Sequence, residues 1–190
     1  MTSLLVSLAA PSLFGSTNTP VDRYQREFSL LNRFGLQANV IIAASYANSE
    51  SQDLVLSKAL IYPALRQVVR QYPELGLINY CRSSERKRSQ HRLYSAVLQN
   101  INLDAHVQFI NIPREEEDAG LGTTIERYHG LWFDPSKTPP WRLVVVNGRH
   151  ALLVFDHFIT DARGGSTSWR AYWRHSTPQK KTKAVPQLWT

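Results

Sequence analysis

The amino-acid sequence predicts a mixed α/β fold. Short apolar segments rich in β-branched residues alternate along the chain with segments whose apolar residues recur at helical spacing. An Asn147-Gly148 pair between two apolar runs is a strong signal for a β-hairpin. Hydrophobic residues make up 43% and charged residues 19% of the 190 residues, a composition typical of a folded domain and not of a disordered chain.

The first half of the chain opens with a linker-like segment and then predicts one helix and one strand. Residues 11–20 are rich in proline, glycine and serine, which is typical of a loop. Residues 22–34 mix apolar and charged side chains at helical spacing, and Asp22 can cap the helix. Residues 37–46, QANVIIAASY, predict a buried strand.

A second helix is predicted to run to about Tyr72. Ser49 or Ser51 can cap its start, and two adjacent apolar stripes give it a broad buried face. Pro63 lies inside this helix and is expected to kink or split it, because proline lacks the backbone N–H that the helix needs. Pro73 ends it.

The middle of the chain predicts two more strands and a helix. Residues 75–80 and 105–112 have strand character, and the polar residues 82–92 between them form an exposed connection. Acidic residues from position 114 suit the first turn of a helix toward His129, although two glycines weaken that prediction.

The clearest unit is a hairpin followed by a glycine-rich turn. Residues 141–146 form the first strand and residues 151–155 the returning strand. A helix is expected after Gly165, and residues 176–190 form a basic, loose tail.

His157 and Asp161 are the candidate site residues. The H-x-x-x-D spacing is unspecific alone, but the hairpin delivers His157 at the end of a buried strand, and a glycine pair follows Asp161. Strand ends are where α/β proteins place reactive groups. The five other histidines show no metal spacing, so no metal site is predicted.

The run WRLVVVNGRHALLVFDHFITDARGG resembles the motif region of alcohol acetyltransferases, and of the wider superfamily that includes condensation domains and chloramphenicol acetyltransferase. The segments VDRYQREFSLLNRFGLQANVIIAASY, ALIYPALRQVVRQYPELGLI and WFDPSKTPPWRLVVV resemble earlier parts of the same family. The resemblance covers about residues 22–175.

The resemblance implies a single chloramphenicol-acetyltransferase-like lobe, a mixed sheet packed by helices, without the family's second lobe. The expected organisation is an N-terminal segment and linker at 1–20, the acyltransferase lobe at 21–175 and the tail at 176–190. The implied activity is O-acyl transfer from acetyl-CoA or another acyl-CoA to an alcohol. Acyl-CoA is then a co-substrate, and no permanently bound cofactor is expected.

The resemblance also implies roles for the two site residues. His157 is the general base, a role that suits an imidazole because its ordinary pKa of about 6.5 leaves it largely neutral near pH 7. Asp161 is architectural and pairs with an arginine. Arg142, Arg163 and Arg23 all remain candidates for that arginine, and no cofactor-binding residue or oxyanion donor can be assigned.

The chain departs from the family pattern at two positions and in length. Asp156 stands where the family has its first motif histidine, and Ala162 replaces the glycine after the aspartate. Two explanations of the length compete: a fragment or shortened product that is incomplete as a catalyst, or a single-lobe chain that builds shared sites in a homo-oligomer, as chloramphenicol acetyltransferase does. In either case a second lobe or another copy is needed to complete the site.

Two other function classes remain open. The first is a non-catalytic module that binds a partner or a CoA-like ligand. The second is nucleic-acid binding, which is suggested by the net charge of +7, concentrated at residues 82–92 and in the tail. We do not expect this function, because the charge lies in predicted loops and no recognition helix is evident. The apolar residues 1–14 are too short to span a bilayer and make a poor signal peptide, so we expect a cytoplasmic protein, with peripheral membrane contact as an alternative.

Overall fold

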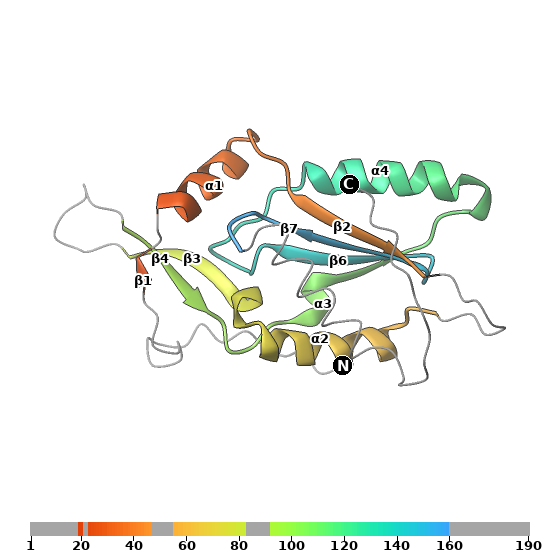
Figure 1. Ribbon diagram of the computed structural model, residues 1–190, viewed down its shortest axis with the longest axis horizontal. Helices are drawn as coiled ribbons and strands as arrows, with labels where there is room; N and C mark the ends of the chain where they lie inside the picture. Colours follow the sequence, from red (N-terminus) through yellow and green to blue (C-terminus); the bar gives the residue numbers. More distant parts are fainter. Residues whose placement is uncertain (1–18, 21–22, 47–54, 83–91, 160–190) are drawn as a thin grey trace.

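The computed structural model describes residues 19–20, 23–46, 55–82 and 92–159 (Figure 1). The helices are α1 (Arg23–Arg33), α2 (Lys58–Gln71), α3 (Leu103–His106) and α4 (Glu117–His129), with 3-10 turns at Pro73–Gly76 and Arg114–Glu116. The strands are β1 (Thr19–Pro20), β2 (Val40–Ser45), β3 (Leu77–Arg82), β4 (Arg92–Val97), β5 (Val107–Ile110), β6 (Trp141–Val146) and β7 (His150–Phe155). These elements confirm the predicted mixed α/β class.

The main sheet has four strands in the order β2-β7-β6-β5. β7 lies antiparallel to both β2 and β6, whereas β5 and β6 are parallel. Phe155 at the end of β7 is paired with Trp141 on one side and with Val40 on the other. The sheet is therefore mixed, as predicted, and its two central strands are the hairpin that leads to His157.

Helices cover both faces of this sheet. In Figure 1, α2 lies on one side of the sheet, and α1 and α4 lie on the other. Alternate residues of β6 point to the two faces of the sheet. Leu143 and Val145 pack in the apolar cluster that includes α2, while Val144 and Val146 pack in the apolar cluster on the α4 side. Because both faces of the central strands are buried, these strands are continuous apolar runs.

A second, smaller sheet has the order β1-β4-β3 and is antiparallel throughout. Sequence analysis missed β1 and β4, since Thr19–Pro20 lies in the predicted linker and Arg92–Val97 follows a polar, basic stretch. The predicted 82–92 connection does join two paired strands, and residues 83–91 lie outside the described part of the chain.

The predicted start of α2 is wrong. The helix begins at Lys58, with Ser57 at the N-cap, so neither Ser49 nor Ser51 caps it. Pro63 does not split it either, because α2 is one helix from Lys58 to Gln71. Its buried residues Ile61, Ala64, Leu65 and Val68 hold it against the sheet, and this packing offsets the hydrogen bond that proline cannot make.

The segment after β4 also differs in detail from the prediction. The strand expected at 105–112 is shorter, since α3 takes up its first two residues and β5 begins at Val107. The helix expected toward His129 is present as α4 despite its glycines. One of them, Gly120, is explained by packing: a Cβ there would lie 2.6 Å from Cγ2 of Ile112.

His106 is a buried core histidine. It is 2% exposed, its ring stacks on the Trp141 indole with centroids 4.4 Å apart, and its Nδ1 lies 2.9 Å from the Trp141 carbonyl oxygen. Because a carbonyl only accepts, Nδ1 carries the proton and donates. Burial lowers the pKa of His106 from 6.5 to about 4; the Trp141 hydrogen bond opposes this shift, and the charge of Arg142 adds to it.

We predict that His106 makes the fold sensitive to acid. The folded state binds fewer protons than the unfolded state between about pH 6.5 and pH 4, so stability falls as pH falls through that window. This lowering of the His106 pKa corresponds to about 3 kcal/mol of stability. Urea unfolding at pH 7 and pH 4 should show a much smaller loss in His106→Gln than in wild type. His129→Gln, at an exposed histidine on α4, is the control and should behave like wild type.

Candidate functional site

The β6–β7 hairpin brings the candidate site residues to the end of the sheet. Its turn has the predicted chemistry: Asn147 and Gly148 have φ of 53° and 64°, the left-handed region that these residue types tolerate. The Asn147 side chain also accepts a 2.7 Å hydrogen bond from the backbone N–H of Ile112. The turn thus fixes the register in which β7 runs back to residue 156.

Asp156 shapes the turn that carries His157. Its Oδ1 accepts a 2.9 Å hydrogen bond from the Phe158 N–H, and its carbonyl oxygen accepts a 3.0 Å bond from the Ile159 N–H. Its own N–H donates to the Pro140 carbonyl oxygen at 3.0 Å. Phe158 and Ile159 then return to the core. The residue that departs from the family pattern is therefore a hydrogen-bonded part of the turn.

His157 emerges between buried neighbours. Asp156 and Phe158 are 3% and 2% exposed, whereas His157 is half-buried. One face of the imidazole lies against Phe28 of α1, with ring centroids 5.3 Å apart and an interplanar angle of 20°. The ring is thus neither enclosed by the core nor lying free on the surface.

The carboxyl of Asp156 differs electrostatically from an exposed one. Burial raises its pKa above the ordinary value; the Phe158 N–H and, to a smaller extent, the charge of His157 act in the opposite direction. A protonated carboxyl costs less to bury than an ionised one. Burial therefore favours the neutral form of Asp156, the residue next to His157.

Asp161 and the Gly164-Gly165 pair lie outside the described residues, as do Ala162 and Arg163. Of the three arginines proposed to pair with Asp161, only Arg142 has a described side chain. It lies on β6 and is half-buried, and its Nη1 is buried with no hydrogen-bond partner among the described residues. The roles of His157 and Asp161 therefore stay predictions.

Two surface pockets are described, and His157 lines neither of them. One lies between α2 and residues 99–104. The other lies where α1 and α4 end and is lined by residues such as Asn32, Gln37 and Trp132. Within the described ranges, no group of three or more His, Cys, Asp or Glu residues is arranged to hold a metal ion, and no helix has the length and apolar character to cross a bilayer.

Sequence analysis missed a hydrogen-bonded chain at the opposite end of β7. Ser45 Oγ lies 2.8 Å from Nδ1 of His150, and Nε2 of His150 lies 2.8 Å from Oε1 of Glu117. The sequence pattern around His150 indicates no metal site and no other role. No local motif signals the contact, because the three residues come from β2, α4 and β7. The chain ties the start of α4 to the sheet, and the His150 hydrogen bond is the largest cause of the lowered pKa of Glu117.

We predict that Asp156 makes stability depend on pH in the direction opposite to His106. Its raised folded-state pKa means that the folded state holds a proton that the unfolded state has lost, so stability falls as pH rises from about 4 through that pKa. Asp156→Asn keeps the acceptor for the Phe158 N–H without the charge.

The Asn variant should therefore gain stability over wild type as pH rises from 4 to 7, in denaturant unfolding at each pH. Asp156→Ala, which loses the acceptor, should be less stable than Asp156→Asn by about 1 kcal/mol at both values. An Asn-minus-wild-type difference that does not change with pH would contradict the burial of an ionisable group here.

Comparison with known proteins shows that this chain is similar in fold to several solved structures. No family model and no curated protein sequence matches the chain. The starter condensation domain of rhizomide synthetase RzmA superposes with a TM-score of 0.62 at 12% identity, over 83% of this chain and 36% of that one. The four-domain nonribosomal peptide synthetase holo-AB3403, bound to AMP and glycine, gives 0.63 at 15%, over 89% and 12%. The tallysomycin biosynthesis protein TlmII gives 0.58 at 14%, over 83% and 37%.

The chain spans about a third of the RzmA domain and of TlmII. A double mutant of the RzmA domain, similar to this chain at 12% identity, has been solved in complex with C8-CoA and Leu-SNAC. At these identities the likeness concerns the fold alone. The described residues therefore share the fold of a lobe-sized part of a condensation domain, which confirms the predicted single mixed-sheet lobe.

Proposed function

We propose that this chain is the histidine-bearing lobe of a CoA-dependent acyltransferase, with an alcohol hydroxyl as acceptor and His157 as general base. The observation that carries the proposal is the position of His157. It lies two residues beyond β7, half-buried and stacked on Phe28, in a lobe with a condensation-domain fold.

The geometry around His157 suits a base. The turn formed by Asp156 fixes the backbone on both sides of the imidazole, and the Phe28 ring limits its rotation. A positioned side chain transfers protons more effectively than a mobile one, because no orientation has to be found at the moment of reaction. The likeness to a domain solved with C8-CoA supports acyl-CoA as the donor.

The proposed reaction conserves atoms and charge. The alcohol oxygen attacks the thioester carbonyl carbon while its proton moves to the imidazole of His157. The tetrahedral intermediate then breaks its C–S bond, and the proton passes from the imidazolium to the departing CoA sulfur. The products are an ester and free CoA, so thiol release reports each turnover.

Asp161 keeps its proposed role as a positioning residue, and Arg142 is the partner that we favour. Arg142 lies on β6, paired with Val154 of the neighbouring strand β7. Its buried Nη1 lacks a hydrogen-bond partner among the described residues. Buried guanidinium groups are costly unless paired, and a carboxylate is the partner that satisfies them best.

A catalytically incomplete lobe is the second candidate. The observation that favours it is the absence of His157 from both described pockets. Such a lobe would bind CoA or a partner without turnover. We further propose that a second lobe or another copy completes the site around His157. The basic segments considered for nucleic-acid binding lie mostly outside the described residues, and we do not propose that function.

Replacing His157 by alanine should abolish acyl transfer. Purified chain is incubated with acetyl-CoA or octanoyl-CoA and a panel of alcohols while free thiol is followed. Loss of a general base should lower the rate by about 10² to 10⁴. His129→Ala, on the exposed end of α4, is the matched control and should keep the wild-type rate.

Equal thiol release by wild type and His157→Ala would rule out the proposed base. Absence of release by wild type, with saturable CoA binding in calorimetry, would favour the incomplete lobe.

Replacing Phe28 by leucine should lower kcat several-fold while the KM for acyl-CoA stays the same. Leucine keeps an apolar side chain at the position but removes the flat face against which the imidazole stacks. Phe34→Leu is the control, because Phe34 is 69% exposed just beyond the same helix. A change in KM alone would show that Phe28 contributes to substrate binding and does not position the base.

A further inference from the structure

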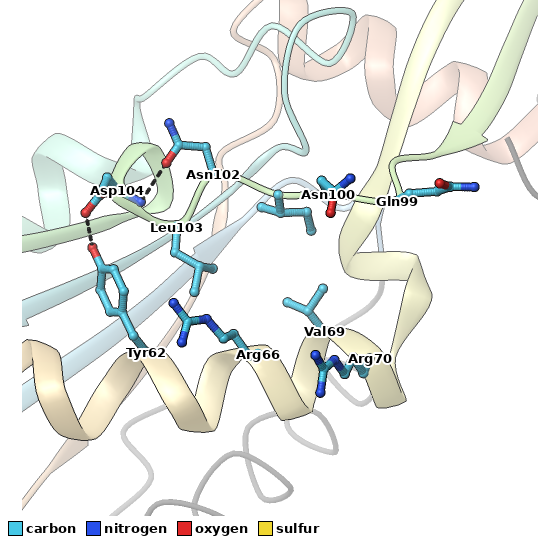
Figure 2. A pocket seen from close by; sticks show the side chains of 10 residues that line it. Tyr62, Arg66, Val69, Arg70, Gln99, Asn100, Asn102, Leu103 and Asp104 are labelled. Atoms are coloured by element: carbon cyan, nitrogen blue, oxygen red, sulfur yellow. Dashed lines mark hydrogen bonds between the residues drawn. The ribbon is translucent and has the colours of Figure 1, made fainter. Parts of the chain in front are cut away.

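A pocket that His157 does not line lies between α2 and the segment that leads into α3 (Figure 2). The pocket has a volume of about 330 Å³, at the lower end of the range for small-molecule sites. In Figure 2 Leu103 extends toward the helix and Val69 extends toward the loop, so apolar side chains line its inner part.

Two guanidinium groups give this pocket its charge. Arg66 and Arg70 are one turn apart on α2, and both line the pocket and are exposed. No described carboxylate forms a salt bridge with either of them. The pocket thus holds two positive charges on one wall that the described part of the fold does not use.

The one carboxylate in the pocket wall is already occupied. Asp104 Oδ1 lies 2.5 Å from Nζ of Lys58 and accepts a 2.7 Å hydrogen bond from the Tyr62 hydroxyl. These contacts lower the pKa of Asp104, the Lys58 hydrogen bond being the largest cause, so Asp104 is ionised and paired. Its charge is offset by Lys58 and leaves those of Arg66 and Arg70 uncompensated.

The loop opposite the arginines carries neutral donors and no further acid. Asn100 lines the pocket, and Asn102 uses its side-chain oxygen to accept a 3.1 Å bond from the Asp104 N–H, which fixes the start of α3 (Figure 2). The pocket therefore combines paired cations, amide groups and a small apolar wall.

We propose that this pocket binds the phosphate group of a small-molecule ligand, with Arg66 and Arg70 as its principal donors. A phosphate monoester carries close to two negative charges at neutral pH, which matches two guanidinium groups. Guanidinium groups also meet phosphate oxygens with paired N–H donors. The volume accommodates the phosphate and a short adjoining group, and the rest of the ligand extends into solvent.

The phosphate could be inorganic or part of a larger molecule such as CoA, and the test separates these sources. The full chain is titrated by calorimetry at low salt with pyrophosphate, with CoA, and with pantetheine, which lacks phosphate. Wild type should bind pyrophosphate, and Arg66→Gln and Arg70→Gln should each weaken binding by about tenfold, the change expected for losing a hydrogen bond to a charged group.

The matched control is Arg127→Gln, which removes an exposed arginine from α4, on the opposite side of the sheet. It should bind pyrophosphate like wild type. Equal weakening in Arg127→Gln would show attraction by overall charge and overturn the proposal, as would absence of binding by wild type or unchanged binding in both pocket variants.

If CoA competes with pyrophosphate and loses affinity in the same two variants while pantetheine does not compete, the phosphates of CoA occupy the pocket. If only pyrophosphate depends on Arg66 and Arg70, the ligand is a smaller phosphate compound. His157→Ala should bind pyrophosphate normally in either case, so this site is tested separately from the proposed acyl transfer.

Discussion

The pairing of β6 with β7 is the constraint on which the rest of the structure depends. These strands form the centre of the four-stranded sheet, and their side chains build both apolar layers. A slip of one residue would exchange the faces of every side chain in the hairpin. The left-handed Asn147-Gly148 turn prevents that slip at one end, and the Asp156 N–H bond to the Pro140 carbonyl oxygen closes the other. The position of His157 follows from this register, two residues after the last strand pair.

The parts of the fold that sequence predicts well are those set by local chemistry. The β6–β7 hairpin could be predicted because its turn residues and its apolar runs agree, and α1 and β2 follow from periodicity alone. The missed strand β4 begins in a basic, polar stretch and is stabilised by pairing with β3. The start of α2 was misplaced because serines earlier in the chain offer equally good caps, and tertiary packing decides among them.

The candidate site, like the fold, combines features that local sequence predicts with features that only tertiary packing creates. The location of His157 beyond a buried strand could be predicted, but its contact with Phe28 joins residues far apart in the chain, and no pattern announces it. The same holds for the contact between Ser45, His150 and Glu117, and for the pocket that Arg66, Arg70 and Asn100 line together. Each needs three-dimensional packing to bring ordinary residues together.

The two proposed sites place different demands on what surrounds the lobe. The pocket beside α2 is lined by the helix on one side and by residues 99–104 on the other. His157 is half-buried, and the described contact of its ring is the stack on Phe28. A base that must exclude water and hold two substrates needs a second surface opposite that ring. The half-buried imidazole is therefore the physical reason for proposing that a second lobe or another copy completes the catalytic site, whereas the proposed phosphate site is lined by residues of this lobe.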